Sequence, residues 1–280
     1  MLSDADVQFV DRRYGKNAVR LLYVRREGIR HYIKEVEVNT KVTLNDTRDF
    51  LRGDNSKIVA TDSQKNTVYI LAKQLGIQTI EKFAIDLSEH FLKQYSHVTN
   101  TDISITEQPW KRIQTGGREH AHAFVETADG VRYCRVEQQR YGQPKVTQGI
   151  RALKIMKTTQ SAFNNFVNDE FRSLPDSTDR IFCTIVNATW DFHTLSGLNF
   201  DNAWETVKSS ILDVFAGPPD TGVFSPSVQK TLYDSQKLIL SKVPQMDKIE
   251  IKFPNVHAYE FDLSKFKSFG FTENKQVGFR

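Results

Sequence analysis

The chain has 280 residues, of which 39% are hydrophobic and 26% are charged, and its formal net charge is +4. This length and composition can bury one large core or two smaller ones, as in ordinary soluble globular proteins. The small positive charge is compatible with an anionic small ligand but too weak to indicate nucleic acid as a partner. Because no apolar stretch reaches the length of a membrane span, we expect no membrane partner either.

The chain begins with a pattern that is typical of antiparallel strands. One side of the run from 35 to 44 carries Val36, Val38, Thr40, Val42 and Leu44, and the other side is polar. This alternation predicts a strand with one buried face, and residues 19–26 are its expected hairpin partner.

Two stretches with helical spacing follow. The first contains Val68, Leu71, Ala72 and Leu75, and the second contains Ile80, Phe83, Ala84, Leu87 and Phe91. Asn66 is a suitable N-cap for the first helix, and Gly76 is suited to end it. Ile103 and Ile105 then begin another strand.

The second half of the chain repeats this order. Residues 124–126 and 131–136 flank Ala128-Asp129-Gly130, which indicates a tight turn between strands. Residues 180–190 alternate again, and helical spacing then predicts one helix over 204–214 and another over 228–239. Strand-like runs at 249–253 and 255–263 close the half.

The two halves therefore predict the same unit twice. Each unit has antiparallel hairpins with helices on one face of the sheet, which is the α+β class. We place the first domain at residues 1–140 and the second at residues 141–280. Because one-sided sheets leave open edges, side-by-side assembly into a closed barrel is a natural outcome.

Two pairs of residues have ordinary structural interpretations. Cys134 and Cys183 lie in strand-like runs without CxxC spacing, which favours buried thiols in a reducing compartment. His120 and His122 share a strand face and could both reach a metal ion, but no cysteine or carboxylate cluster accompanies them. Structural hydrogen bonding is the favoured interpretation of this pair.

Three side chains are suited to a flat anion with many hydrogen-bonding edges. Arg180 offers a planar fork of donors, Gln229 offers an amide donor and acceptor, and Phe163 offers a surface for stacking. Taken singly, these residues also fit a surface arginine, an exposed helical glutamine and a core phenylalanine.

Two helix starts offer backbone donors. Ser225-Pro226 predicts an N-cap followed by proline at the first helical position, which places Val228 in the first turn. Backbone N–H groups there lack intrahelical acceptors and suit an anionic oxygen. Thr61 and Asp62 occupy the related position in the first half. Ordinary capping is the alternative in both places.

Three further polar residues need an explanation. Asn255 and His257 share a face of a strand-like run that is otherwise apolar, so they need partners or a ligand, although a hydrogen-bonded core histidine stays open. Lys16 precedes the first strand, where an apolar interface could make the amine a base and solvent would leave it an ordinary lysine.

Seven motifs, in this order, resemble the urate oxidase (uricase) family of tunnelling-fold proteins from near the N-terminus to about residue 265. They are Tyr14-Gly15-Lys16, Ala60-Thr61-Asp62-Ser63, Ser161-Ala162-Phe163, Asp179-Arg180-Ile181, Ser225-Pro226-Ser227-Val228-Gln229, Pro254-Asn255 and His257. The resemblance implies two tunnelling-fold domains per chain and a homotetramer that shares active sites between subunits. It also implies oxidation of urate by O₂ and water to 5-hydroxyisourate and hydrogen peroxide, with neither a metal nor an organic cofactor.

The resemblance assigns a role to each matched residue. Arg180 and Gln229 would hold two edges of the purine, Phe163 would stack on it, and Thr61, Asp62 and Val228 would also bind substrate. Lys16, Thr61 and His257 would form a proton relay, and Asn255 would hold O₂ or water above the ring.

Two other functions stay open. Pterin-acting tunnelling-fold enzymes usually anchor their heterocycle with a buried glutamate, whereas the acids in these motifs are Asp62 and Asp179. A non-catalytic purine-binding protein would bind urate without consuming O₂. The chain ends Gln-Val-Gly-Phe-Arg rather than in a Ser-Lys-Leu signal. We expect a peroxisomal location if the source is eukaryotic, by the resemblance, and a cytoplasmic one otherwise.

Overall fold

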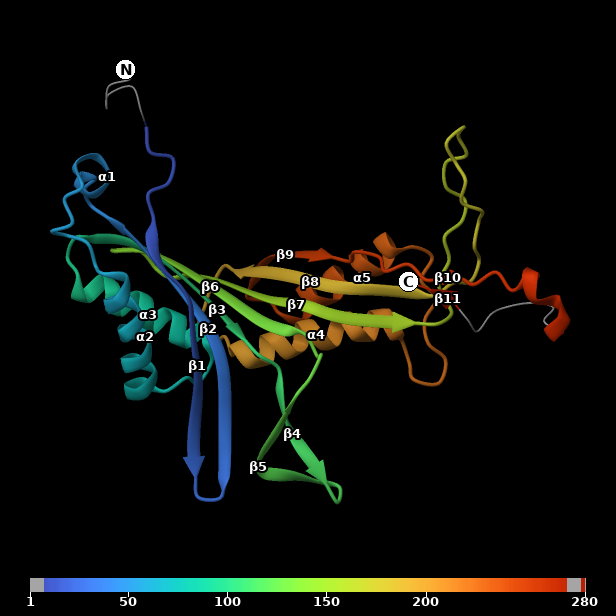
Figure 1. Cartoon of the computed structure of the whole chain (residues 1–280), viewed down its shortest axis with the longest axis horizontal. Coiled ribbons are helices and arrows are strands. Elements are labelled where there is room, and N and C mark those ends of the chain that lie inside the picture. Colours follow the sequence, from blue (N-terminus) through green and yellow to red (C-terminus); the bar gives the residue numbers. More distant parts are fainter. Residues whose placement is uncertain (1–7, 271–277, 280) are drawn as a thin grey trace. The chain divides into compact units, whose positions relative to one another are not determined.

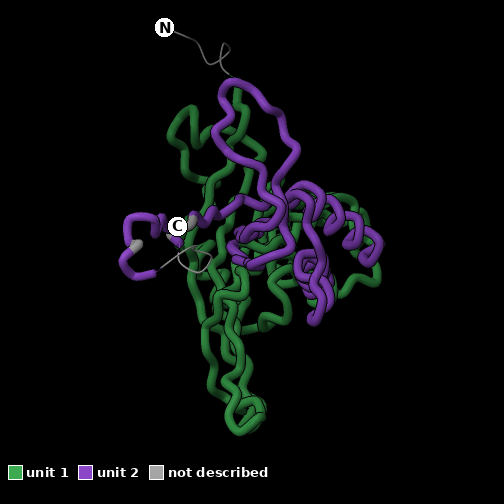
Figure 2. The backbone as a smooth tube through the Cα atoms, turned by 90° about the vertical axis from the view of Figure 1, so that its right-hand side faces the viewer, with its two compact units in different colours: residues 1–151, 189–204, 245–249 green, residues 152–188, 205–244, 250–280 purple. Residues whose placement is uncertain are grey.

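The computed structural model describes residues 8–270 and 278–279 (Figure 1). It divides into two compact units, each drawn from three segments (Figure 2). Unit 1 comprises residues 1–151, 189–204 and 245–249, and unit 2 comprises residues 152–188, 205–244 and 250–280. The predicted domain boundary after residue 140 falls in the turn between β6 and β7, and the division into two sequence-continuous domains stays a prediction.

A seven-stranded sheet is the main element of the fold. Its hydrogen-bonded strand order is β1-β2-β3-β6-β7-β8-β9. The strands are β1 (Tyr14–Glu27), β2 (Arg30–Leu44), β3 (Val98–Glu107), β6 (Val131–Gln139), β7 (Lys145–Lys157), β8 (Phe182–Phe192) and β9 (Met246–Lys252). The pairs that link β1, β2, β3, β6 and β7 are all antiparallel, which confirms the predicted α+β class. The predicted buried face of β2 is also confirmed, since its five residues are at most 3% exposed.

In unit 1 the helices α2 (Thr61–Leu75) and α3 (Ile80–Gln94) lie against this sheet, and a short α1 (Arg48–Arg52) precedes them (Figure 1). The predicted stripe of α3 is buried throughout. The predicted stripe of α2 is wrong at Leu75, which is 54% exposed because the helix ends there, before Gly76. Asn66 is not an N-cap: α2 begins five residues earlier, and the Asn66 amide donates to Asp62 within the helix.

A second hairpin, β4 (Trp110–Thr115) and β5 (Arg118–Glu126), forms a separate two-stranded sheet. The turn predicted at residues 128–130 is present, with Gly130 at φ 75°, but it joins strands of different sheets because β5 pairs with β4. Within β5 the His120 ring accepts hydrogen bonds from the backbone N–H groups of His122 and Ala123. Structural hydrogen bonding is therefore confirmed for the His120 ring, while the His122 ring contacts the His120 ring edge-on with centroids 4.6 Å apart.

Unit 2 contains most of α4 (Phe200–Ala216) and all of α5 (Val228–Lys242). Phe182 of β8 contacts Phe215 of α4, with ring centroids 4.9 Å apart. After β9 the chain forms the short β10 (Tyr259–Glu260), a 3-10 segment (Ser264–Phe269) and β11 (Gly278–Phe279). Cys134 in unit 1 and Cys183 in unit 2 are buried and free, as predicted. In the described part of the chain, no helix is long and apolar enough to cross a membrane.

Replacing Thr79 by Ala should destabilise the protein by about 1 kcal/mol, because Thr79 is the N-cap of α3 and accepts a hydrogen bond from the Lys82 backbone N–H at 3.1 Å. Chemical denaturation of the variant would measure the loss. Thr67→Ala is the matched control, since the Thr67 hydroxyl only donates to a carbonyl inside α2. Equal losses in the two variants would contradict the capping role.

Candidate active site

Lys16 lies on β1 directly before a β-bulge. It is the cross-strand partner of Thr40, and the register of the pair shifts immediately afterwards. Within the bulge Ala18 adopts a positive φ of 55°, and its backbone N–H donates to the Asn39 side chain at 2.8 Å. Bulges of this kind often redirect a side chain next to a functional site.

Thr61 and Asp62 are the first two residues of α2. Their backbone N–H groups have no intrahelical acceptors and lie at the positive end of the helix dipole, as predicted for an anion site. Hydrogen bonding from Lys65 lowers the pKa of Asp62, and the charge of Lys16 lowers it further. The structure therefore brings Lys16 and the start of α2 into one region of unit 1.

Arg180 and Phe163 lie together in unit 2. The guanidinium carbon of Arg180 is 5.0 Å from the centre of the Phe163 ring. Burial lowers the pKa of Arg180, and its Nε is buried without a hydrogen-bond partner among the described residues. A planar anionic ligand could accept a hydrogen bond from this buried donor and lie against the neighbouring aromatic ring.

Phe166 is a neighbour of this site that the sequence analysis missed. Its ring stacks on Phe163, with centroids 4.4 Å apart and an interplanar angle of 16°. Arg172 in turn lies over Phe166 at 4.0 Å. Because Phe166 stacks on Phe163 and the Arg180 guanidinium also lies over the Phe163 ring, a planar ligand would stack there only if one of these side chains moved. The sequence signal for Phe166 was its spacing, three residues after Phe163 in a turn-rich segment. That signal is weak, because the chain contains 19 phenylalanines.

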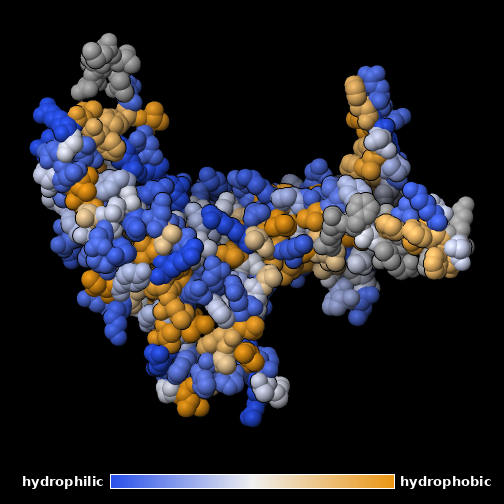
Figure 3. Space-filling view, viewed as in Figure 1, coloured by the Kyte–Doolittle hydropathy of each residue, from blue (hydrophilic) through white to orange (hydrophobic). Residues whose placement is uncertain are grey.

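The segment between Phe163 and Arg180 projects from its neighbours and is yellow in Figure 1. In Figure 3, hydrophobic residues lie along one side of this projection, and hydrophilic residues cover the rest of the visible face. Its exposed apolar residues are Val167 at 77%, Phe171 at 85% and Leu174 at 52%. Phe163 and Arg180, the predicted stacking and fork residues, are the two ends of this segment, so the conformation of the segment affects where both side chains lie.

The segment before α5 pairs with the chain next to Phe163 and Arg180. Ser161 and Ser225 form an isolated parallel bridge, and Ser161 also accepts a hydrogen bond from the Arg180 backbone N–H at 2.8 Å. Ser225 is therefore not the N-cap: Ser227 caps the helix, and Val228 and Gln229 are its first two residues. The bridge draws Ser225 into extended pairing, so the helix starts two residues later than proline chemistry alone suggests. The bridge thus joins the segments that carry Phe163 and Arg180 to the segment that leads into Val228 and Gln229.

Asn255 and His257 do not share a regular strand face, so that prediction is wrong. In the run from 255 to 263 only Tyr259–Glu260 is a strand. Asn255 instead makes an isolated bridge to Thr184 of β8. His257 is exposed, and its ring stacks near that of Tyr259 with centroids 6.0 Å apart. The pairing with β8 is a single bridge and the next strand begins only at Tyr259, so no continuous alternation runs through His257; both polar residues lie in unit 2.

The predicted site residues therefore fall into two groups. Unit 1 carries Lys16, Thr61 and Asp62, and unit 2 carries Phe163, Arg180, Val228, Gln229, Asn255 and His257. In the described ranges, no group of three or more His, Cys, Asp or Glu residues is arranged to hold a metal ion.

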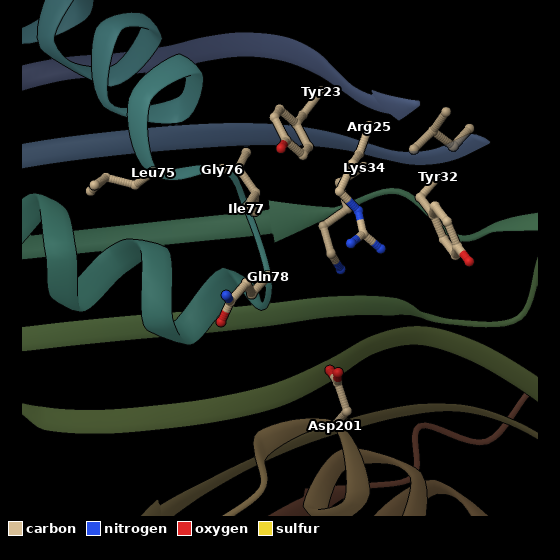
Figure 4. A pocket seen from close by; sticks show the side chains of 10 residues that line it. Tyr23, Arg25, Tyr32, Lys34, Leu75, Gly76, Ile77, Gln78 and Asp201 are labelled. Carbon is tan, nitrogen blue, oxygen red and sulfur yellow. The ribbon is translucent and has the colours of Figure 1, made fainter. Parts of the chain in front are cut away.

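A separate hollow of about 600 Å³ lies in unit 1 (Figure 4). Tyr23, Arg25, Tyr32 and Lys34 of the β1–β2 hairpin line it, together with residues 75–78 and Asp201. None of the predicted site residues lines this hollow.

The fold and these two groups define an α+β protein whose helix starts and partly buried arginine suit a small planar anion. Residues 12–137 and 146–277 match the family model described as Uricase. The chain belongs to the uricase family.

Individual relatives agree with this assignment. The uricase of Danio rerio is 47% identical over 263 residues, which cover 94% of this chain and 88% of that protein. The uricase of Oryctolagus cuniculus is 46% identical and covers 93% of this chain and 87% of its own. The crystal structure of uricase from Arthrobacter globiformis superposes with a TM-score of 0.88 at 32% identity, covering 98% of this chain and 90% of that one.

Proposed function

We propose that the protein is a urate oxidase, which oxidises urate with O₂ and water to 5-hydroxyisourate and hydrogen peroxide. The observation that carries this proposal is the match to the uricase family over nearly the whole chain. Urate gives up two electrons, O₂ accepts them and leaves as hydrogen peroxide, and water adds its oxygen at C5 of the oxidised ring.

The substrate is held by the unit 2 group. Arg180 and Gln229 bind two edges of the purine, and Phe163 stacks on its plane. The buried Nε of Arg180, which lacks an acceptor among the described residues, supports this role because it leaves a charged donor for the ligand. The first backbone N–H groups of α5, at Val228 and Gln229, suit an anionic oxygen for the same reason.

Protons move through Lys16, Thr61 and His257. The amine accepts the proton that the Thr61 hydroxyl passes on from substrate or water, and His257 supports proton movement on the same side. Asn255 holds O₂ or water above the ring. Thr61 and Asp62 also offer backbone N–H groups at the start of α2. The protein's contribution is orientation, proton transfer and exclusion of bulk water.

We propose that the reaction needs neither a metal nor an organic cofactor, because deprotonated urate is itself the electron donor. Oxygen uptake on metal-stripped protein tests this directly. Consumption of one O₂ and release of one hydrogen peroxide per urate supports the proposal. Restoration of activity only by an added metal would contradict it. Binding of urate without O₂ uptake would indicate a non-catalytic purine-binding protein, and turnover of pterins alone would indicate a pterin enzyme.

Subunit mixing tests whether the two groups meet across an interface, in a homotetramer with shared sites. Lys16→Met and Arg180→Ala proteins should each be nearly inactive, but mixed subunits should regain activity. With random exchange, about one site in four pairs an intact Lys16 side with an intact Arg180 side. Native mass spectrometry would verify exchange. No recovery after verified exchange would contradict the shared site, because a site within one chain cannot be rescued by mixing.

A further inference from the structure

Two fully buried polar side chains lie between the strand that carries Lys16 and the segment that carries Thr61. Thr40 and Gln64 are both 0% exposed. The Thr40 hydroxyl donates to Gln64 Oε1 at 2.8 Å, and Gln64 Nε2 donates to the Val59 carbonyl oxygen at 3.0 Å. Thr40 is the cross-strand partner of Lys16, and Val59 is two residues from Thr61. The Thr40 hydroxyl oxygen also lies 3.4 Å from the Lys16 carbonyl oxygen, so the Thr40–Gln64 pair links the two segments by way of β2.

A second link joins the same segments. The Tyr14 hydroxyl oxygen accepts a hydrogen bond from the Val59 backbone N–H at 2.8 Å. Both polar groups of Val59 are thus held by side chains, one from β1 and one from α2. Residues 58–60 belong to no helix or strand, so these side chains replace the hydrogen bonds that would otherwise fix the backbone.

The backbone around Lys16 has little freedom to adjust. A Cβ on Gly15 would lie 1.7 Å from the Thr40 carbonyl oxygen, so β1 approaches β2 more closely there than any side chain permits. After Lys16 the bulge is held by the bond from Ala18 to Asn39. Thr40 therefore lies on a rigid part of the sheet beside Lys16. By hydrogen bonding to Thr40, Gln64 can hold Val59 and the start of α2 in a fixed position relative to Lys16.

The hydroxyl of Thr40 is not required for packing. Its neighbours on the buried face of β2, at positions 36, 38, 42 and 44, are all valine or leucine. Valine has nearly the shape of threonine and would fill the same space among them. The hydroxyl therefore serves as a hydrogen-bond donor, at 2.8 Å to Gln64 Oε1 and at 3.4 Å to the Lys16 carbonyl oxygen. Without it, the buried Gln64 Oε1 would lose its donor.

We propose that the Thr40–Gln64 pair positions the reaction's proton-transfer groups, by fixing the backbone at Val59–Thr61 against the strand that carries Lys16. The inference rests on the relay proposed above. Proton transfer needs heavy atoms within about 2.6–3.2 Å of each other. A displacement of about 1 Å can cost about 10²-fold in rate. The pair therefore acts on the rate without touching substrate, as a positioning device.

The test is a crossed pair of substitutions at one position. Thr40→Val keeps the shape and removes the hydroxyl, so kcat for urate should fall by about 10-fold while affinity for a xanthine-type inhibitor is retained. Thr40→Ser removes a buried methyl group and keeps the hydroxyl, so it should lower the melting temperature but keep kcat near that of the wild type. A purely structural role would make kcat follow stability in both variants.

Thr101→Val is the matched control. Thr101 lies opposite Val42 in the same sheet, is 0% exposed, and has its hydroxyl oxygen 2.5 Å from the Ser88 hydroxyl of α3. The Thr101→Val variant loses a buried hydroxyl hydrogen bond of the same kind. Because Thr101 does not link the segments of Lys16 and Thr61, kcat of this variant should not change. Gln64→Met removes the hydrogen bonds of Gln64 to Thr40 and to Val59, so it should lower kcat as Thr40→Val does. It replaces Thr40→Val in the test if Thr40→Val does not fold.

The kcat of Lys16→Met shows whether the proton relay itself exists, and so distinguishes an error in the relay from an error in the positioning role. If Lys16→Met is slow but Thr40→Val and Gln64→Met keep wild-type kcat, the positioning role is overturned and the relay stands. If Lys16→Met itself keeps wild-type kcat, the relay is wrong and the positioning role is overturned with it.

Discussion

Replacing Lys16 by Met, or Thr61 by Ala, should lower kcat for urate by about 10²–10⁴-fold, the usual contribution of a general acid–base group. Inhibitor affinity should be nearly unchanged. Thr61 is the first residue of α2, and alanine retains the backbone N–H group that would bind purine. The charge of Lys16 lowers the pKa of Asp62, after the larger effect of Lys65, so the lysine lies in the region of this helix start. Oxygen uptake would measure kcat, and calorimetry with a xanthine-type compound would measure binding.

The double variant distinguishes one relay from two separate groups. If the amine and the hydroxyl pass the same proton, removing both should be little worse than removing either, because residues that act as a unit are strongly non-additive. Losses that multiply would show that Lys16 and Thr61 act independently. Lys65→Met is a suitable control, since Lys65 also contacts Asp62 in the first turns of α2 but is not assigned to the relay.

Arg180→Lys should weaken binding of urate or a xanthine-type inhibitor by about 2–4 kcal/mol, the cost of losing a charged partner in a desolvated site. In dissociation constants this is roughly 30- to 900-fold. The reason is geometric: an ammonium group cannot reproduce the planar fork that Arg180 places beside Phe163. The buried Nε, without an acceptor among the described residues, is the donor that the ligand would use.

Calorimetry on the folded variant measures this loss. Arg25→Lys is the matched control, since the Arg25 guanidinium also lies over an aromatic ring, 4.4 Å from the centre of Tyr32, but on the β1–β2 hairpin. Near-normal inhibitor binding by Arg180→Lys would remove Arg180 from the substrate site. Equal weakening by both lysine variants would point to a general effect of charge rather than to a fork at one position.

The sequence by itself determined the elements whose burial follows a regular period. The alternation in β2 and the stripe of α3 were correct because a buried face repeats every two residues in a strand and every 3.6 in a helix. The order of motifs likewise identified the family, since it depends on the chain alone. Local chemistry was less reliable at helix ends: Asn66 and Ser225 are both suitable caps, yet neither caps its helix.

Only the tertiary structure decided what depends on partners that are distant in sequence. Ser225 is drawn into a bridge with Ser161, and Asn255 into one with Thr184, so neither follows its local pattern. Among the described residues, the Nε of Arg180 has no hydrogen-bond partner, and neither this nor the buried Thr40–Gln64 pair has a sequence signature. The stacking of Phe166 left only the weak signal of two phenylalanines three residues apart. The physical reason is that a polar side chain's role depends on whether folding supplies a hydrogen-bond partner, and those partners come from segments that no local period connects.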